Sequence, residues 1–593
     1  MIILGLYIGQ CSSIAIYRDN KIIFATSEER FTRIKSDETY PIEAIQAGLK
    51  FCNISSDEID MVVIGQLRTQ LTSMIIRNIS SFSVNDHLRT MKEFWTPRLL
   101  GQPHPKMIEL FSSKIKLDKF PFEEISNPFY RFDYGEFTDE SIEIIVEFLK
   151  NSITAHLGIE KAKIIMLDHH SCHSAYALYA SPIRDDNTII VTGDAHGDGL
   201  SGTISSYDKK NNSINRLKEY RDKDFRLARI YRYTTLLLRM LPDEHEYKVM
   251  GLAPYYDGPK IKEIEAILSE LQKLDGLDWK FNSEINNIFD FLEQKLGHYR
   301  FDHIAAGLQS FTEKLLVEWL QNIAKHYDAK TIVFSGGLSM NVKANMKISQ
   351  IPEINKFFVC GGGGDLSLCM GACYAFAESQ SISSEPLKDL YLGMPCKYSK
   401  EELTKNCHQY TITDFHDEKQ IVDRLLDGKI IAVCTDRAEM GPRALCNRSI
   451  IADPRNKENI QKINRKIKNR DFWMPFAPVV MSENQHEILE NPKQLQSPHM
   501  TIAFDTKEGK KNMPAAVHQY DGTARPLILE KNVNPRIWNV LNLFYKKTGI
   551  PALVNTSFNL HGEPIVNSFD DAIHVFKNSG LDSLWLDHHI IDK

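Results

Sequence analysis

The sequence predicts an α/β protein with a large, internally duplicated N-terminal domain and a smaller α/β domain after it. The chain has 593 residues, which is too many for one ordinary hydrophobic core. A strand, turn, strand pattern occurs in residues 1–24 and again in residues 188–214. Near residues 380–400 this regularity gives way to small polar residues, two prolines and a glycine, which is typical of a linker.

The N-terminal domain is predicted over residues 1–385, and residues of about 75–150 form an aromatic-rich, irregular insert in it. Its first strands are IILGLYI, SIAIY and KIIFA, and TIIVT and GTISSY repeat the same hairpin order later. Repeated hairpins with Asp- and Gly-rich first turns, separated by helical segments, are typical of two similar lobes. This is the architecture of the actin-like ATPase and sugar-kinase type.

The C-terminal domain is predicted over residues 401–593, after a linker over residues 386–400. It opens with a helix near residues 400–407 and continues with the buried strand KIIAVCT. Strands and helices then alternate to the end of the sequence, so we expect a smaller α/β domain.

The composition is that of an ordinary globular protein, with 42% hydrophobic and 25% charged residues. A formal charge of −6 gives no basic surface for broad nucleic-acid binding. The ten cysteines contain no CxxC pair, which argues against a zinc ribbon or a disulfide framework. No stretch approaches a membrane span, and the apolar start MIILGLYIGQ has no basic flank. We therefore expect a cytoplasmic protein without membrane or nucleic-acid partners.

A candidate metal site begins in the run LDHHSCHSAYALY. Asp168 can cap a helix there, and His169 and His173, four residues apart, then share one face and can occupy two positions on a divalent metal. A satisfied buried histidine pair is the alternative. Asp194 and Asp198 lie on a glycine-rich turn after an apolar strand, where carboxylates can point into a cleft, although an ordinary hairpin turn has the same composition.

Glycines follow directly after two further strands, in FSGGLSMNVKAN and CGGGGDLSLCMGA. They allow the backbone to approach a ligand closely. Asp365 follows four of these glycines and is a further candidate carboxylate for the same cleft.

Several longer motifs occur in a fixed order: TSEERFTRIK, HHSCH, GDAHGDG, EYKVMGLAPY, SGGLSMNVKAN, DRAEMGPRALCNRSIIADPR, PAAVHQYDGTARP and NTSFN. Through them the chain resembles the carbamoyltransferases of the NodU/CmcH/TobZ group along essentially its whole length. The resemblance implies an N-terminal domain similar to the TsaD type, holding Fe2+ or another divalent metal with His169, His173, Asp194 and Asp365. It also implies catalytic roles for Asp198, Glu246 and Lys248, and a nucleotide cradle of Gly336, Gly337 and Asn341.

The C-terminal domain resembles the YrdC type, which implies synthesis of carbamoyl adenylate from carbamoyl phosphate and ATP with Mg2+. The sequence has no Walker A loop, so we expect side chains to hold the phosphates. For Lys468 and Arg470, a basic helix end is the alternative. The predicted carbamoyl phosphate and ATP ligands are Arg443, Arg448, Lys468, Arg470, His518, Asp521, Arg525, Asn555, Ser557 and Asn559.

Five positions depart from the pattern of the family. Gln10 and Cys11 stand where a His-Asp pair is usual, Cys446 and Ser367 replace glycines, and Met474 replaces an arginine. These changes are compatible with altered specificity and also with weakened activity.

We therefore predict an O-carbamoyltransferase that activates carbamoyl phosphate with ATP and carbamoylates a hydroxyl of a small-molecule acceptor. The insert is a candidate wall of the acceptor pocket. Three alternatives are a fused tRNA threonylcarbamoyl-type transferase, a catalytically weakened binding homologue and a plain sugar kinase. The charge of −6 argues against the first, and the C-terminal motifs argue against the last.

Overall fold

The computed structural model describes residues 1–69, 82–115, 132–468 and 470–593. It divides into two compact units, Met1–Leu387 and Lys388–Lys593, and the division falls within the predicted linker. Each unit is described below by itself.

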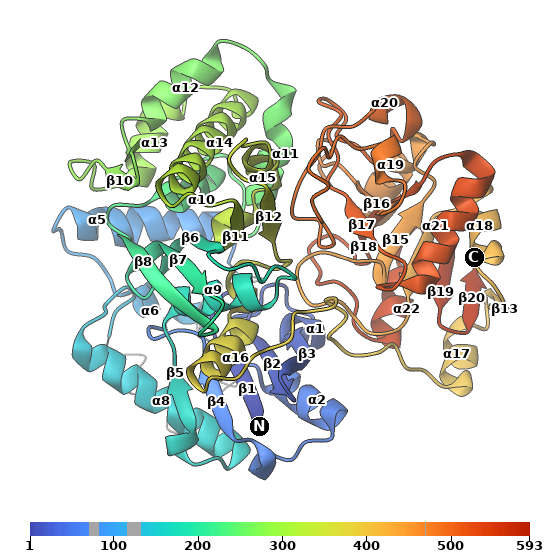
Figure 1. The fold of residues 1–593 in the computed structure, drawn as a ribbon, viewed down its shortest axis with the longest axis horizontal. Helices are drawn as coiled ribbons and strands as arrows, with labels where there is room; N and C mark the ends of the chain where they lie inside the picture. Colours follow the sequence, from blue (N-terminus) through green and yellow to red (C-terminus); the bar gives the residue numbers. More distant parts are fainter. Residues whose placement is uncertain (70–81, 116–131, 469) are drawn as a thin grey trace. The chain divides into compact units, whose positions relative to one another are not determined.

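The first unit contains two five-stranded sheets with the same topology (Figure 1). One sheet has the order β3-β2-β1-β4-β5, and the other has the order β8-β7-β6-β11-β12. In each, the first three strands form an antiparallel meander, and the fourth and fifth strands add in parallel beside the first. The predicted duplication and actin-like architecture are therefore confirmed. The strands are β1 (Ile2–Tyr7), β2 (Ser13–Arg18), β3 (Lys21–Ser27), β4 (Met61–Ile64), β5 (Ile164–Met166), β6 (Ile189–Gly197), β7 (Leu200–Asp208), β8 (Ser213–Arg221), β11 (Thr331–Ser335) and β12 (Lys356–Val359).

Two helices, α9 (His169–Tyr179) and α16 (Leu368–Ser379), join the sheets. Helix α9 packs on β6 and β11, α16 packs on β1 and β2, and the two helices pack on each other. Their backbones approach closely, since a Cβ at Gly371 would lie 2.1 Å from the carbonyl oxygen of Cys172. A Cβ at Gly5 of β1 would likewise lie 2.0 Å from the carbonyl oxygen of Cys369. These contacts hold the starts of both helices near one point.

The remaining elements of this unit surround the sheets. Part of the predicted insert, residues 70–81 and 116–131, lies outside the described residues, so the expected acceptor-pocket wall is described only in part. No helix within the described ranges is long and apolar enough to cross a membrane. The elements are α1 (Glu29–Thr32), α2 (Ile42–Cys52), α4 (Val84–Arg89), α5 (Thr96–Leu99), α6 (Met107–Leu110), α8 (Asp139–Leu157), α10 (Leu227–Leu237), α11 (Glu246–Leu252), α12 (Lys260–Leu268), β9 (Gln272–Asp275), β10 (Asp278–Phe281), α13 (Ile288–Leu296), α14 (Phe301–His326) and α15 (Val342–Ser349).

The second unit is built on an eight-stranded mixed sheet in the order β13-β20-β19-β14-β15-β18-β16-β17. The expected smaller α/β domain is confirmed, and the helix and strand predicted at its start correspond to α17 and β14. Its strands are β13 (Thr411–Asp414), β14 (Ile431–Cys434), β15 (Arg448–Ala452), β16 (Ala477–Met481), β17 (Leu527–Leu529), β18 (Ala552–Ser557), β19 (Ser583–Leu586) and β20 (His589–Asp592). Its helices are α17 (Lys400–Cys407), α18 (Lys419–Leu426), α19 (Glu458–Ile463), α20 (Gly509–Asn512), α21 (Pro535–Thr548) and α22 (Phe569–Lys577).

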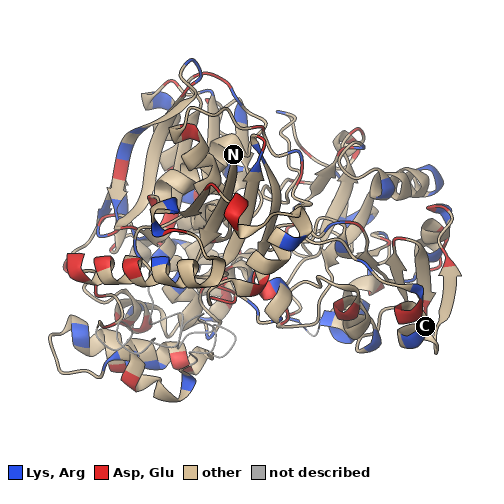
Figure 2. Cartoon of the chain, turned by 90° about the horizontal axis from the view of Figure 1, so that it is seen from below, with Lys and Arg blue, Asp and Glu red and all other residues tan. Residues whose placement is uncertain are grey.

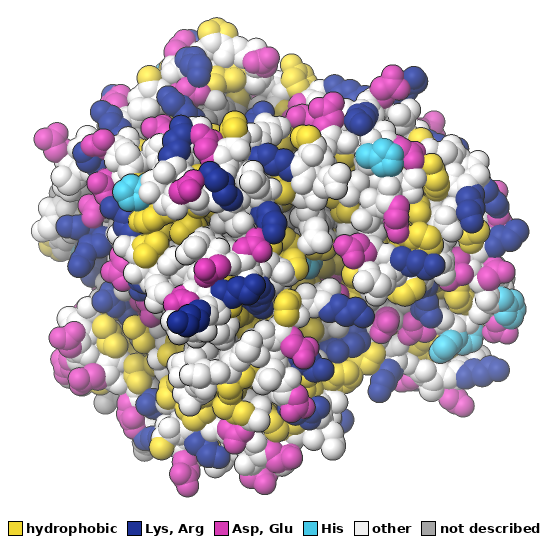
Figure 3. Space-filling model, viewed as in Figure 1, with side chains coloured by type: hydrophobic (Ala, Val, Ile, Leu, Met, Phe, Trp, Pro, Cys, Tyr) yellow, Lys and Arg dark blue, Asp and Glu magenta, His cyan; other side chains and the backbone are white. Residues whose placement is uncertain are grey.

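Positively and negatively charged residues are interspersed along the described parts of both units (Figure 2). On the face seen in Figure 3, hydrophobic side chains form small patches among charged ones. This surface agrees with the net charge of −6 and shows no broad basic stripe on that face.

Candidate functional site

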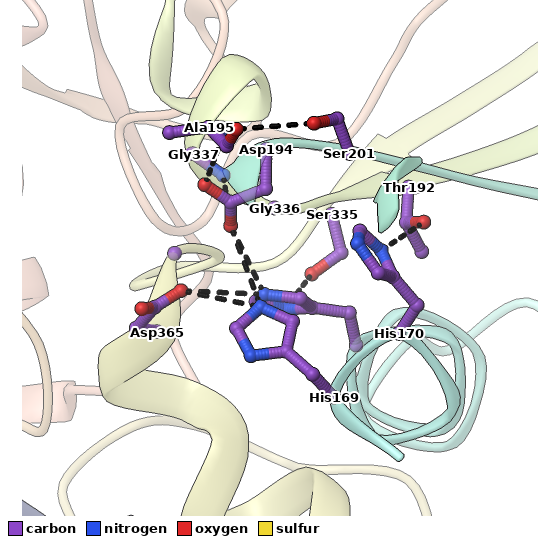
Figure 4. Close-up of polar contacts among 12 residues, drawn as sticks. His169, His170, Thr192, Asp194, Ala195, Ser201, Ser335, Gly336, Gly337 and Asp365 are labelled. Atoms are coloured by element: carbon purple, nitrogen blue, oxygen red, sulfur yellow. Dashed lines mark hydrogen bonds and ion pairs between the residues drawn. The ribbon is translucent and has the colours of Figure 1, made fainter. Parts of the chain in front are cut away.

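Four side chains from distant parts of the first unit meet at one point (Figure 4). Each offers one ligand atom, and these atoms lie within 4.8 Å of one another. Asp168 caps α9 by accepting a hydrogen bond from Ser171 N at 2.8 Å, so the helix starts where both histidines face inward. The four residues are His169 and His173 of α9, Asp194 of β6 and Asp365 in the loop before α16.

The distances in this cluster suit a bound cation. Nε2 of His173 lies 3.2 Å from Oδ2 of Asp194 and 3.5 Å from Oδ1 of Asp365. Nε2 of His169 lies 3.8 and 3.6 Å from the same two atoms. Both Nε2 atoms are buried and make no hydrogen bond to the described residues. A buried polar atom without a partner costs free energy, and a bound cation would remove this cost. Two imidazoles and two carboxylates therefore fit a divalent transition metal, including the expected iron.

The electrostatics of the cluster point the same way. Burial alone would lower the pKa of His169, but Asp365 and Asp194 raise it to about 9. Burial alone would raise the pKa of Asp194, but the adjacent imidazoles of His169 and His173 hold it well below its usual range. In the metal-free protein a proton on His169 thus offsets part of the carboxylate charge, and a divalent cation can take its place.

Neighbouring groups fix the orientation of the ligands. Asp194 accepts hydrogen bonds from the backbone N–H groups of Ala195 at 2.6 Å and Gly337 at 3.1 Å. Gly197 lies against the imidazole of His169, because a Cβ there would come within 2.2 Å of the ring. The Tyr7 hydroxyl donates to Oδ2 of Asp365 at 2.6 Å. Burial and the nearby Asp365 raise the pKa of Tyr7 well above its usual value, so the phenol stays protonated. Sequence reasoning did not identify Tyr7, because its partner Asp365 is 358 residues away.

Asp198, a predicted catalytic residue, contacts the start of α9. Its carboxylate accepts hydrogen bonds from the backbone N–H groups of Leu67, Arg68 and His169, at 2.8 to 3.1 Å. These bonds hold the start of α9 against the segment after β4. In this structure Asp198 therefore helps to position His169, and its catalytic role stays a prediction.

Glu246 and Lys248 lie on α11, where Lys248 is buried. Glu246 accepts a hydrogen bond from Asp243 N at 2.8 Å. Burial and the nearby Asp243 raise the pKa of Glu246 to about 8. The turn that contains Asp243 also contacts the first hairpin, because Gln10 donates to the carbonyl oxygen of Asp243 at 2.6 Å. Gln10, one of the departures from the family pattern, thus has a structural partner.

The predicted nucleotide cradle lies at the end of β11. Gly336 has φ of 89°, and a Cβ there would lie 2.3 Å from the carbonyl oxygen of Gly193. Only glycine fits this turn without displacing the neighbouring strand. Asn341 caps α15 and exchanges side-chain hydrogen bonds with Gln309 at 2.9 and 3.1 Å. Its amide is therefore engaged by the protein in this structure.

In the second unit, three of the predicted phosphate ligands come together. The Lys468 ammonium donates to Oγ of Ser557 at 3.1 Å and also to Oδ1 of Asn559. Oγ of Ser557 donates to Oδ1 of Asn559 at 2.7 Å. Asn555, on the same strand β18, donates to the carbonyl oxygen of Ala444 at 2.9 Å. The end of β18 thus joins Lys468 and the loop of residues 441–448.

A second pair of predicted ligands lies in a turn. Nδ1 of His518 is 3.3 Å from Oδ1 of Asp521 and also accepts from the backbone N–H of Tyr520 at 3.3 Å. Arg443 and Arg525 are half-buried. The shared role of these four residues in phosphate binding stays a prediction.

Two predicted phosphate-binding arginines make hydrogen bonds to backbone carbonyl groups. Arg448 is fully buried, and its guanidinium donates at 2.7 to 3.2 Å to the carbonyl oxygens of Met394, Thr435, Asp436, Asn447 and Asn567. Arg470 lies 4.0 Å over the Phe476 ring and donates to the carbonyl oxygens of Met474 and Pro475 at 3.4 and 3.3 Å. Both arginines therefore bond within the protein in this structure, and their phosphate-binding roles stay predictions.

Glu439 is a residue that sequence reasoning missed. One of its oxygens accepts from the backbone N–H groups of Leu445, Asn447 and Arg448, at 2.6 to 3.2 Å, and shapes the loop of residues 441–448. In that loop Cys446 has φ of 87°, a conformation that favours glycine.

Comparison with known proteins identifies the family. Residues 3–374 match the family model described as Carbamoyltransferase N-terminus, and residues 422–593 match Carbamoyltransferase C-terminus. The chain belongs to the carbamoyltransferase family. The predicted resemblance and the predicted carbamoyltransferase activity are thus confirmed.

Three relatives illustrate the range of this family. An uncharacterized protein of Methanocaldococcus jannaschii is 29% identical, over 100% of this chain and 99% of its own length. The nodulation protein NolNO of Sinorhizobium fredii is 27% identical, over 98% of this chain and 78% of its own. The 3'-hydroxymethylcephem-O-carbamoyltransferase of Amycolatopsis lactamdurans is 26% identical, over 47% of this chain and 52% of its own. The likeness to the first two of these relatives therefore spans nearly the whole chain.

Proposed function

We propose that this carbamoyltransferase is an ATP-dependent O-carbamoyltransferase that uses carbamoyl phosphate and acts through carbamoyl adenylate. The observation that carries the proposal is the cluster of His169, His173, Asp194 and Asp365 in a chain that matches both carbamoyltransferase models. We assign adenylate formation to the unit of residues 388–593 and transfer to the unit of residues 1–387.

Adenylate formation needs groups that bind the phosphate oxygens of ATP. Because this chain has no Walker A loop, we expect cationic side chains or other side-chain donors to bind them. Carbamoyl phosphate first loses phosphate to water and leaves carbamate. A carbamate oxygen then attacks the α-phosphorus of ATP, the bond to the bridging oxygen breaks, and pyrophosphate departs. We propose that Lys468, Ser557 and Asn559, which lie together, contact the phosphates, and that His518, Asp521, Arg443 and Arg525 complete the site.

Transfer moves the carbamoyl group from the adenylate to oxygen. The acceptor hydroxyl attacks the carbamoyl carbon, the carbon–oxygen bond to AMP breaks, and the hydroxyl proton must leave. A carboxyl with a pKa of about 8 exchanges protons near neutral pH, so we propose Glu246 for this proton and Lys248 as its neighbour in the cleft. A divalent cation held by the four-residue cluster would supply a Lewis acid for the carbamoyl oxygen.

The acceptor class follows from the family. One relative is named for an O-carbamoyl transfer to a hydroxymethyl group, and others are nodulation proteins. We propose a small hydroxylated molecule as the acceptor of this chain.

The first half-reaction can be tested without knowing the acceptor. The protein is incubated with ATP, Mg2+ and carbamoyl phosphate, and pyrophosphate release is measured against a reaction with ATP and Mg2+ alone. We expect release that depends on carbamoyl phosphate. Equal release in both reactions, from a folded protein, would contradict the adenylate route.

A further inference from the structure

The two oxygens of the Asp365 carboxylate have different partners. Oδ1 faces the cluster, 3.6 Å from Nε2 of His169 and 3.5 Å from Nε2 of His173. Oδ2 accepts the hydroxyl of Tyr7 at 2.6 Å. A carboxylate free to rotate can offer either oxygen, or both, to a cation. Here the Tyr7 phenol hydrogen-bonds Oδ2, and Oδ1 is the oxygen that faces the two imidazoles.

Tyr7 is itself held firmly in place. It ends β1, the central strand of the first sheet, and only 4% of its surface is exposed. The neighbouring strand β2 supports the same turn, because Oγ of Ser13 donates to the carbonyl oxygen of Leu366 at 2.9 Å. The first sheet, which contributes none of the four cluster ligands, therefore fixes the loop that carries Asp365.

The second carboxylate of the cluster is oriented by other means. Asp194 is held by the backbone N–H groups of Ala195 and Gly337. Backbone donors cannot be removed by substitution without disturbing the chain. The contact between Tyr7 and Asp365 depends on one hydroxyl, so it can be deleted cleanly.

We propose that Tyr7 is a positioning residue of the metal centre, whose phenol fixes Asp365 so that a single oxygen is presented to the cation. This inference rests on the metal site of the proposed function. Groups that orient metal ligands typically contribute about 10- to 100-fold to metal affinity. We expect the Tyr7 hydroxyl to contribute within this range.

The test is Tyr7→Phe, with Tyr17→Phe as the matched control. Tyr17 lies on the adjacent strand, is buried, and hydrogen-bonds Oγ of Ser384 at 2.9 Å, away from the cluster. Each variant loses one buried hydroxyl bond, so we expect similar small decreases in melting temperature. Titration of the metal-free full chain with Co2+ should show affinity about 10- to 100-fold weaker for Tyr7→Phe and nearly unchanged for Tyr17→Phe. The visible spectrum of bound Co2+ should change in Tyr7→Phe alone.

A double-mutant cycle tests the same role through Asp365. If Tyr7 acts through this carboxylate, Tyr7→Phe should cost no further Co2+ affinity in an Asp365→Ala background. Equal Co2+ affinity for the wild type and a folded Tyr7→Phe would overturn the role of Tyr7 alone, as would full additivity in the cycle. A wild-type chain that binds no Co2+ would overturn the metal site as well.

Discussion

The two halves of the first unit have the same scaffold but place different chemistry on it. The helix that follows the fifth strand carries His169 and His173 in the first half, whereas in the second half Asp365 lies just before it. The first strand ends near Tyr7 in one sheet and near Asp194 in the other. Corresponding helices and strands of the two halves therefore have an end near one point. The first half supplies imidazoles there, and the second half supplies carboxylates.

A duplicated fold can thus assemble a mixed set of ligands, with imidazoles from one half and carboxylates from the other. If both halves supplied imidazoles, or both supplied carboxylates, like charges or unpaired donors would meet at the centre. Complementary residues allow the cluster to be buried without a cation and to bind one. The comparison predicts that ligands from both halves are needed for the metal but not for the chemistry of the second unit.

Replacing His173 with Ala should weaken metal binding by the first unit more than any other change considered below. The cluster then loses one of its two imidazoles, so we expect metal affinity to fall by more than about 100-fold and carbamoyl transfer to be lost. Metal content after dialysis against a chelator measures the first effect. Pyrophosphate release that depends on carbamoyl phosphate should persist, because it is assigned to residues 388–593.

His170→Ala is the matched control for this experiment. His170 lies on the same helix and is equally buried, but its Nδ1 contacts Oγ1 of Thr192 at 2.8 Å instead of the cluster. We expect this variant to keep its metal. Full metal occupancy in His173→Ala, or loss of pyrophosphate release with the fold intact, would contradict the division of labour.

Asp592 in the second unit shows how a carboxylate behaves when fixed cations hold it instead of imidazoles. Burial alone would raise its pKa, but hydrogen bonds from Arg424 and Ser583 lower it from 3.8 to about 2. The folded-state pKa lies below the unfolded one, so this stabilisation is complete above about pH 4 and is lost as the pH falls towards 2. Asp592→Asn should cost about 2 kcal/mol at pH 7.

Chemical denaturation of wild type and Asp592→Asn between pH 2 and 7 measures this difference in unfolding free energy. The unfolding free energies of the two proteins should converge at the acidic end. There the wild-type carboxylate is protonated and therefore uncharged, like the Asn side chain. A constant difference at every pH would show that the substitution acts through packing and not through charge.

The last prediction concerns two loop residues that have nearly the same φ angle. Gly336 in the first unit has φ of 89°, and Cys446 in the second has φ of 87°. A side chain in this region costs about 1 kcal/mol or more. Cys446→Gly should therefore be more stable than Cys446→Ala by about 1 kcal/mol, the reverse of the usual order, because both lose the sulfur and only glycine relieves the backbone. Urea denaturation of the two variants checks the sign, and a more stable alanine variant would refute the strain.

Sequence reasoning succeeded where local spacing determines geometry. The four-residue spacing of His169 and His173 on one helix, and carboxylates at the ends of strands, predicted residues that the structure brings together. It did not anticipate the backbone carbonyl oxygens around Arg448, because a sequence does not show which groups a buried guanidinium will contact. It also missed Tyr7, since nothing local indicates a partner that comes from the opposite half of the domain.

The separation of the four ligands along the chain has a consequence for biosynthesis. His169 is made early, but Asp365 leaves the ribosome only after most of the first unit has been synthesised. A nascent chain can offer two imidazoles and one carboxylate at most until then, and these are not yet held in place by the second sheet. If the four residues hold a cation as proposed, its capture would follow translation of both halves, and metal loading would report that the first unit has been completed and folded.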